Sequence, residues 1–381
     1  MTDFEDIRSY RDSEVPAAIR ELVKDPAYPQ LAKYVFPERK LNEITKDLLA
    51  ITTIREFQEK ISYPIVHRMV DPKTEGIKMC GTENMNKQYP YLFISNHRDI
   101  TLDAAILNVA MHEAGILTTE IAIGDNLMVQ PWIMLFIKLN RGFLVRRNLP
   151  VRETLLASRQ LSAYIRNTLS DRKISVWLAQ REGRTKDSND TTQESILKML
   201  NMSGNADFLT NLETLSICPL SISYEYDPCD FLKAQEFQLK RDNPDYKKTG
   251  QDDLLSMLTG INGYKGKVVY RFGFPIKEEI KTLYNRNLDK REQITEICTI
   301  IDRQIHANYE IYNTNKIAYD LLLGENRFTK EYDEPEKTAF CRYVQEQLTK
   351  VNIPDKDEAF LTNKMLKMYA NPLINYLKAV I

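Results

Sequence analysis

His97 is the first residue whose type and position suggest chemistry. It follows the apolar run Tyr91–Asn96, which predicts a strand, and it precedes Asp99 and Asp103. Open α/β sheets place their ligands at strand ends. An imidazole that titrates near neutrality, with a carboxylate to fix its tautomer, has the parts of a general base. The alternative is structural: Asp99 or Thr101 caps a helix, and the histidine only occupies the turn.

Arginines follow two further predicted strands. Arg146 and Arg147 come after the apolar run 142–145, and the turn Arg181–Lys186 comes after the run 175–179. Between Lys138 and Lys198 there are 13 Lys and Arg against 6 Asp and Glu, a local charge of +7 in a chain of net charge −1. The planar guanidinium group matches phosphate oxygens, so this segment favours an anionic ligand. The alternative is a solvated basic helix face.

Two more features accompany these arginines. The turn after 175–179 contains Glu182, Gly183 and Arg184, and glycine permits a close backbone approach in such a turn. The run 217–226 is a predicted strand that Pro219 interrupts. Glu182 either accepts a hydrogen bond from a ligand hydroxyl or pairs with one of the arginines.

In this order and spacing, the four segments resemble the four sequence blocks of the glycerol-3-phosphate and lysophosphatidate acyltransferase family. That family carries His-x4-Asp, a Phe-x-x-Arg-type block, Glu-Gly-x-Arg and a proline-containing strand. The strand 219–225 and the doubled arginine at 146 and 147 are more similar to the glycerol-3-phosphate branch. The resemblance covers about residues 90–230.

Two spacings depart from the family pattern. Five residues rather than four separate His97 from Asp103, and one residue fewer lies between Glu182 and Arg184. Asp103 directly precedes an apolar helical pattern, as the acidic residue of the family does. We therefore expect Asp103 to orient His97, and Asp99 to cap the helix.

The resemblance implies transfer of a fatty acyl group from a thioester of coenzyme A or acyl carrier protein. The acceptor would be a hydroxyl of glycerol-3-phosphate or lysophosphatidate, in phospholipid biosynthesis. His97 would remove the hydroxyl proton while an aspartate, Asp103 or Asp99, stabilises the imidazolium. The implied substrate-binding residues are Arg146, Arg147, Glu182, Gly183, Arg184 and Pro219, the last near the acyl thioester or purely structural.

We expect neither a metal nor a cofactor beyond the thioester co-substrate, because His97 has no His or Cys companion at ligand spacing. The expected partners are the acyl thioester, the lipid or glycerol-phosphate acceptor and a membrane surface. Nucleic acid is not expected, because the arginines are embedded in strand and helix patterns. Two alternatives stay open: an acyltransferase for another lipid acceptor, such as an amino-acid lipid, and a catalytically silent lipid-binding or scaffold protein of the same fold.

The elements around these residues predict an α/β fold, a mixed central sheet with helices on both faces. Apolar runs rich in β-branched residues alternate with helical patterns from residue 91 onward. We expect an N-terminal helical region over residues 1–85, an α/β acyltransferase core over 86–276 and a C-terminal helical extension over 277–381. The polar stretch 234–262, with Asn243-Pro244-Asp245, predicts a loop-rich insertion within the core.

Composition excludes several classes of protein. The 381 residues are 43% hydrophobic and 28% charged, which argues against disorder, and no apolar run approaches the ~18 residues of a membrane span. The five cysteines form no CxxC pair, and the acidic start Met1–Asp6 is unlike a signal peptide. We expect a cytoplasmic protein, peripheral on the inner face of the cell membrane. The apolar segment Leu127–Phe136 either dips into that interface or belongs to the core.

Overall fold

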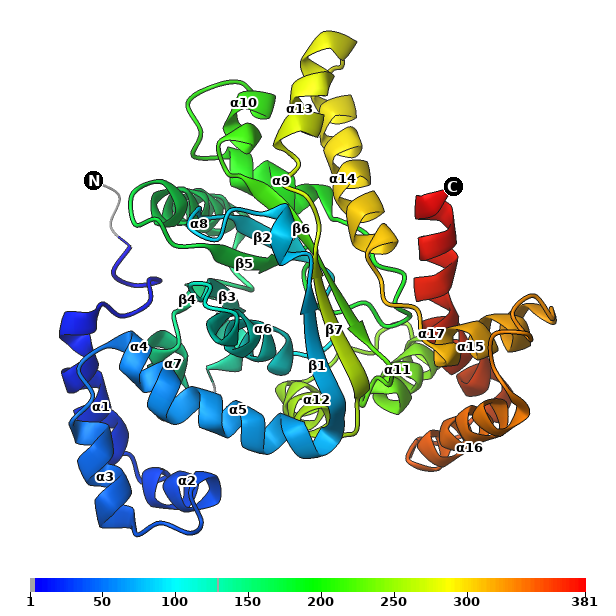
Figure 1. Ribbon diagram of the computed structural model, residues 1–381, viewed down its shortest axis with the longest axis horizontal. Coiled ribbons are helices and arrows are strands. Elements are labelled where there is room, and N and C mark those ends of the chain that lie inside the picture. Colours follow the sequence, from blue (N-terminus) through cyan, green and yellow to red (C-terminus); the bar gives the residue numbers. More distant parts are fainter. Residues whose placement is uncertain (1–3, 129) are drawn as a thin grey trace.

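The computed structural model describes residues 4–128 and 130–381, and within them seven strands form one sheet (Figure 1). The order across the sheet is β1-β7-β6-β2-β5-β3-β4. Neighbouring strands are parallel except β6 and β7, so the sheet is mixed. The strands are β1 (Thr74–Cys80), β2 (Leu92–Ser95), β3 (Glu120–Gly124), β4 (Gly142–Val145), β5 (Val176–Ala179), β6 (Ile217–Tyr224) and β7 (Gly266–Phe272).

The central strand β2 is buried on both faces. All four of its residues are buried, which is why it reads as a continuous apolar run rather than an alternating one. Successive side chains point to opposite faces of a strand. Leu92 and Ile94 accordingly join one hydrophobic core, and Phe93 joins another.

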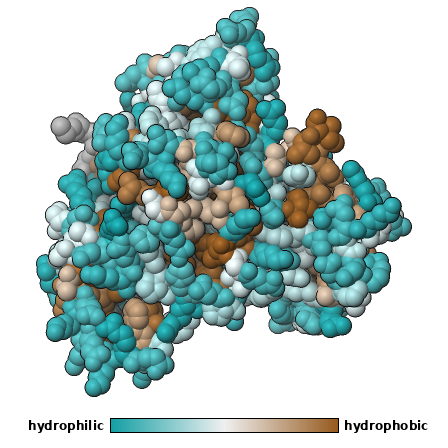
Figure 2. Space-filling view, in the orientation of Figure 1, coloured by the Kyte–Doolittle hydropathy of each residue, from teal (hydrophilic) through white to brown (hydrophobic). Residues whose placement is uncertain are grey.

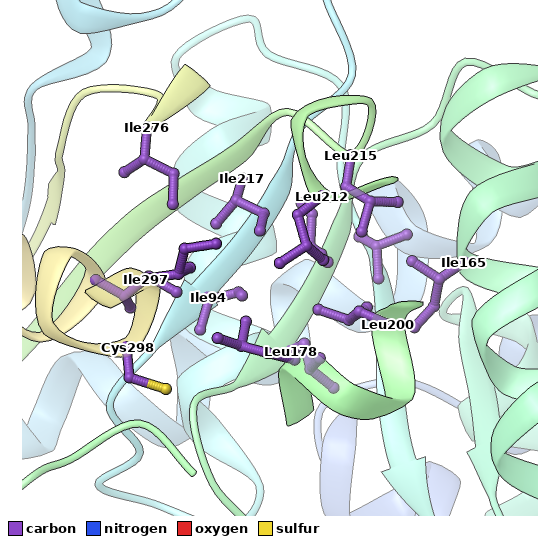
Figure 3. Packing of buried hydrophobic residues seen from close by; sticks show 14 of the residues in the cluster. Ile94, Ile165, Leu178, Leu200, Leu212, Leu215, Ile217, Ile276, Ile297 and Cys298 are labelled. Carbon is purple, nitrogen blue, oxygen red and sulfur yellow. The ribbon is translucent and has the colours of Figure 1, made fainter. Parts of the chain in front are cut away.

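Helices cover both faces of the sheet. On one face, Ile94, Leu178 and Ile217 of the strands pack with Leu200 and Ile297 of the covering helices (Figure 3). The helices on this face are α8 (Val151–Ser170), α9 (Glu194–Asn201), α10 (Phe208–Glu213), α13 (Lys277–Leu283) and α14 (Lys290–Ala307). The opposite face is covered by α5 (Tyr63–Val70) and α6 (Leu102–Glu113). The predicted α/β class, with a mixed sheet and helices on both faces, is confirmed.

The N-terminal helices form a third core with a helix from the centre of the chain. They are α1 (Val15–Lys24), α2 (Tyr28–Val35), α3 (Leu41–Leu49) and α4 (Ile54–Phe57), and they enclose Leu139 at the end of α7 (Pro131–Leu139). Trp132, Leu135 and Phe136 of α7 pack against the same core. The structure therefore favours the core interpretation for these side chains. Val129, within the same predicted segment, lies outside the described residues.

One sequence-based expectation about elements was wrong, and one strand was not predicted. The stretch 234–262 holds most of α11 (Asp230–Asp242) and all of α12 (Gly250–Asn262) rather than a loop. Thr249 and Asp252 form a capping box that begins α12, and Asn243 only ends α11. A strand, β1, lies within the region predicted to be helical, because it is completed by pairing with β7, far along the chain. The domain boundaries themselves stay predictions.

The C-terminal helices pack on α11. They are α15 (Asn313–Leu323), α16 (Glu334–Thr349) and α17 (Glu358–Val380), and their core includes Ala234 of α11. Most of the face seen in Figure 2 is hydrophilic, with hydrophobic side chains gathered in its middle and at the end of α17, where Val380 and Ile381 are exposed. No helix within the described residues is both long and apolar enough to cross a membrane.

Candidate active site

The loop after β2 is fixed by Asn96. Its Nδ2 donates to the carbonyl of Ile222 (2.8 Å), and its Oδ1 accepts from the Ile222 N–H (2.8 Å). The backbone ladder between β2 and β6 ends with Ser95 opposite Leu220. The amide side chain therefore continues the pairing past the last backbone pair, and the chain leaves the sheet at a fixed point just before His97.

His97 is hydrogen-bonded to Asp103. The imidazole Nδ1 lies 2.7 Å from Asp103 Oδ2, and because a carboxylate can only accept, Nδ1 carries the proton. The same oxygen accepts from the backbone N–H groups of Arg98 (2.6 Å) and Asp99 (3.1 Å), which hold it in place. Trp177 packs against the imidazole in a T-shaped arrangement. No described residue hydrogen-bonds to Nε2, which keeps its lone pair.

Asp99 hydrogen-bonds to the start of α6 and not to the imidazole. Its Oδ1 accepts from the N–H groups of Thr101 and Leu102, both at 2.8 Å. Burial, assisted by the neighbouring Asp103, raises the pKa of the Asp99 carboxyl. The other oxygen faces Gly260 of α12 so closely that a Cβ on that glycine would clash with it. The structure therefore places Asp103 on His97 and uses Asp99 as a cap.

The two arginines after β4 both have carboxylate partners. Arg146 forms an ion pair with Asp6, where both side chains are exposed. Arg147 Nη1 donates to Glu182 Oε1 (2.8 Å), so Glu182 takes the pairing role considered above. Gly183 has φ 70°, a left-handed conformation that glycine adopts without strain. Nothing lies within 4 Å of its missing Cβ, so backbone conformation alone explains the glycine.

Arg184 and Pro219 lie in contrasting surroundings. Arg184 is 7% exposed, and its Nη1 has no hydrogen-bond partner among the described residues. Burial lowers the pKa of its guanidinium, but Cys229, Asp99 and Asp227 outweigh that effect and the net shift is upward. Pro219 is buried in the sheet, opposite Ile94 of β2, and its carbonyl accepts from the Gly273 N–H (2.8 Å). It belongs to the strand and not to the charged edge.

Sequence analysis did not identify a buried ion pair formed by Arg98, the residue after His97. The hydrogen-bonded pair His97–Asp103 is called the dyad from here on. Arg98 Nη2 lies 2.8 Å from Asp190 Oδ2, and both side chains are buried. The same carboxylate accepts from the hydroxyls of Tyr309 (2.6 Å) and Thr185 (2.6 Å). The loop after β2 is thereby tied to the loop after β5 and to the end of α14. These three segments meet only in the tertiary fold, so no local sequence pattern identifies Asp190 as the partner of Arg98.

The arrangement gathers the charged residues at one edge of the sheet. Because β2, β3, β4, β5 and β6 run in the same direction, the loops carrying His97, Arg147 and Arg184 all leave at their carboxyl ends. The dyad can accept a proton at Nε2, and the arginines lie on loops at the same edge of the sheet. No cluster of three or more His, Cys, Asp or Glu side chains able to hold a metal occurs among residues 4–128 and 130–381.

Part of the chain matches a known protein family. The family model described as Acyltransferase matches residues 76–223, a segment that runs from β1 into β6. No curated protein matches the chain. Among solved structures, the chain is similar to the 1-acyl-sn-glycerophosphate (LPA) acyltransferase, PlsC, from Thermotoga maritima, with 12% identity over 78% of this chain and 97% of that chain. The TM-score of this match is 0.36.

Proposed function

We propose that this chain, whose residues 76–223 match the acyltransferase family, transfers a fatty acyl group from an acyl thioester to the hydroxyl of glycerol-3-phosphate or lysophosphatidate. The observation that carries the proposal is the His97–Asp103 hydrogen bond of 2.7 Å, which leaves Nε2 with a lone pair. A general base of this kind activates a hydroxyl nucleophile. The donor is a thioester of coenzyme A or acyl carrier protein, and the glycerol-3-phosphate branch is the preferred one.

The reaction needs one addition and one elimination. His97 Nε2 takes the proton of the acceptor hydroxyl as its oxygen attacks the thioester carbonyl carbon. The tetrahedral intermediate then expels the thiolate, which recovers the proton from the imidazolium. Asp103 stabilises the imidazolium and holds the ring with Nδ1 protonated. No acyl-enzyme is required, because the thioester is already activated.

The acceptor phosphate would be held by arginine. Arg184 supports this role best, because a buried guanidinium with a free Nη1 has a strong preference for an anionic partner. Arg146 and Arg147 would add to the positive field at the edge, although each already has a carboxylate partner. Glu182 would act mainly by positioning Arg147, with Gly183 shaping the turn and Pro219 supporting the strand beneath.

The lipid substrate requires contact with a bilayer surface, and the start of α8 suits it. Val151, Leu155 and Leu156 are 81%, 57% and 70% exposed, and their i, i+4, i+5 spacing puts them on one side of the helix. Arg152 and Arg159 are exposed on the same helix, and their charge complements anionic lipids. The helix begins directly after the arginines that follow β4. We propose that this surface, rather than α7, docks on the inner face of the cell membrane.

A thiol-release assay tests the function. Pure protein is mixed with acyl-CoA or acyl carrier protein thioester and with glycerol-3-phosphate, lysophosphatidate or non-phosphorylated lipid acceptors. Release with a phosphorylated acceptor, abolished in His97→Ala, supports the proposal. Release only with a non-phosphorylated acceptor, such as a hydroxylated amino-acid lipid, favours the second candidate. Silence with every acceptor would leave a lipid-binding protein without catalysis.

A further inference from the structure

One buried carboxylate connects the loop after β2 to the loop after β5. Asp190 is 1% exposed, and its side chain accepts from Arg98 Nη2 (2.8 Å). The hydroxyls of Tyr309 and Thr185 also donate to it, both at 2.6 Å. The backbone carbonyl of the same residue lies 2.7 Å from His306 Nε2. A buried carboxylate is costly unless it is paired and hydrogen-bonded, so these contacts together hold Asp190 in place.

Arg98 reaches from Asp190 to the dyad. Its side chain is 7% exposed, and its Cζ lies 5.7 Å from the centroid of the Tyr309 ring. Burial lowers the pKa of the guanidinium, but Asp190 and the other anionic neighbours outweigh that effect and the net shift is upward, so Arg98 stays charged. At the other end of the residue, the backbone N–H donates to Asp103 Oδ2 (2.6 Å), the oxygen that also binds His97 Nδ1.

The peptide group of Arg98 is not held by regular structure. Residues 96–99 belong to no helix or strand, so no backbone ladder fixes the direction of this N–H. Asn96 anchors the chain before His97 through its two hydrogen bonds to β6, and the ion pair of Arg98 anchors it after His97. A rotation of this peptide group would withdraw the N–H from Asp103, whose carboxylate orients the imidazole.

The loop 187–190 is in turn held by α17. Asn371 Nδ2 donates to the carbonyl of Asp187 (2.7 Å), and Asn375 Nδ2 donates to Asn189 Oδ1 (3.2 Å). The two asparagines are four residues apart and therefore lie on one face of the helix. The same helix packs beside α14 (Figure 1). The C-terminal helix thus supports the loop that carries the buried carboxylate.

Stability alone does not account for this ion pair. Replacing a buried ion pair by apolar residues often leaves stability unchanged or raises it. We propose that Asp190 is a positioning residue, which acts through Arg98 to hold Asp103 and His97 in the geometry for proton transfer. The inference rests on the proposed acyl transfer by His97. It also gives α17 a task, which is to support the dyad through the loop 187–190.

The kinetics of one substitution test the proposal. Asp190→Asn keeps an acceptor oxygen but removes the charge that holds Arg98. It should lower kcat for thiol release about 10- to 100-fold, since a misplacement of about 1 Å can cost on the order of 100-fold. The KM values for acyl-CoA and for glycerol-3-phosphate should each stay within about 3-fold, because the residue acts on the dyad and not on either substrate.

An NMR signal provides a readout that needs no substrate. The Nδ1 proton of His97 is observed in protein with isotope-labelled histidine and is assigned by its loss in His97→Gln. Asp190→Asn should shift or broaden this signal, because the hydrogen bond to Asp103 loses its fixed geometry. Asp302→Asn is the matched control: this carboxylate of α14 accepts from Thr192 at the end of the same loop. The control should leave the signal unchanged and kcat within about 2-fold.

A double variant separates positioning from a structural role. Arg98→Met with Asp190→Asn leaves neither charge buried without its partner, so it should be more stable than Asp190→Asn alone. The positioning role predicts that kcat stays low in the double variant. Recovery of turnover together with stability would make the pair merely structural and would overturn the proposal.

The remaining outcomes also decide the matter. An unchanged kcat and an unchanged His97 signal in Asp190→Asn overturn the assignment, as does a raised KM with an unchanged kcat. Should Asp190→Asn fail to fold, Tyr309→Phe carries the test together with the double variant. It removes one hydrogen bond to the carboxylate and should lower kcat about 3-fold or more. A shifted His97 signal in the variants, without thiol release by the wild type, would contradict the proposed function alone.

Discussion

His97 Nδ1 lies 2.7 Å from Asp103 Oδ2, although Asp99 is the nearer carboxylate in the sequence. In the turn between His97 and Asp103, the backbone N–H groups of residues 98 and 99 donate to the Asp103 carboxylate. These hydrogen bonds orient the carboxylate toward the imidazole. Asp99 instead points its Oδ1 at the first N–H groups of α6. The two aspartates therefore have separate tasks, and separate substitutions distinguish them.

Replacement of Asp103 should nearly abolish turnover. In Asp103→Asn the side chain no longer stabilises an imidazolium, and in a protease with a Ser-His-Asp triad the equivalent change lowers the rate by up to ~10⁴. The measurement is kcat from thiol release. Asp99→Asn is the matched control: its amide oxygen can still accept from Thr101 and Leu102, so turnover should change by less than about 10-fold. An inactive Asp99→Asn beside an active Asp103→Asn would contradict the roles assigned here.

Removal of the Arg184 side chain should weaken binding of the acceptor and leave binding of the donor unchanged. Arg184→Gln loses a charged hydrogen bond worth about 1.5–3 kcal/mol, which corresponds to about 10- to 150-fold. We expect this loss as a raised KM for glycerol-3-phosphate, with the KM for the thioester as the internal control. Similar changes in both KM values would argue against a phosphate contact.

A methyl group at position 260 should force α12 away from Asp99. Because a Cβ there would clash with the Asp99 carboxylate, Gly260→Ala should destabilise the protein by about 1–3 kcal/mol, the usual effect of overpacking. Denaturant unfolding measures the change. Gly250→Ala at the start of the same helix meets no atom within 4 Å and should be neutral or slightly stabilising. Equal effects of the two substitutions would show that α12 does not lie against the Asp99 carboxylate.

Asp302 should make stability depend on pH. Burial raises its pKa to about 6 in the folded protein, so the folded state binds the proton more tightly than the unfolded state. The resulting stabilisation is present below about pH 4 and is lost as the pH rises through about 6. The Asp302→Asn side chain does not ionise. Its amide oxygen can still accept from the Thr192 N–H, which in the wild type lies 2.8 Å from Asp302 Oδ1.

The free energy of unfolding of Asp302→Asn, relative to wild type, should therefore increase by about 1–3 kcal/mol between pH 4 and pH 7. Urea denaturation at several pH values measures this difference. A difference that stays constant over the whole range would mean that Asp302 has an ordinary pKa in the folded protein.

The start of α8 should govern attachment to vesicles. The double variant Leu155→Ser, Leu156→Ser removes two exposed apolar side chains and should lower the bound fraction in sedimentation with anionic vesicles about 10-fold or more. High salt should also weaken binding by wild type, because exposed arginines are screened beyond roughly 8 Å at physiological ionic strength. Leu49→Ser, at a 48% exposed site on α3, is the control and should bind normally. Vesicle binding that neither change reduces would exclude this surface.

The sequence by itself determined the central strands of the sheet and pointed to His97 and Asp103. The apolar runs at 91–95, 175–179 and 217–226 predicted strands, and in the fold these strands are buried on both faces, where apolar side chains predominate. His97 and Asp103 were identified because a strand end and the start of an apolar helix are local signals. The Asn243-Pro244-Asp245 signal was also local, and it marked only the end of α11.

Tertiary structure alone decided which charges meet. Arg98 finds Asp190, Arg146 finds Asp6 and Arg147 finds Glu182, and each partner lies on a different element of the fold. Such pairs form because parallel strands bring distant loops to one edge of the sheet. The residue pattern of each segment alone does not indicate which loops will meet. The same holds for Lys186 and Lys248, which share Glu236 of α11 as a partner although they lie on different segments of the chain.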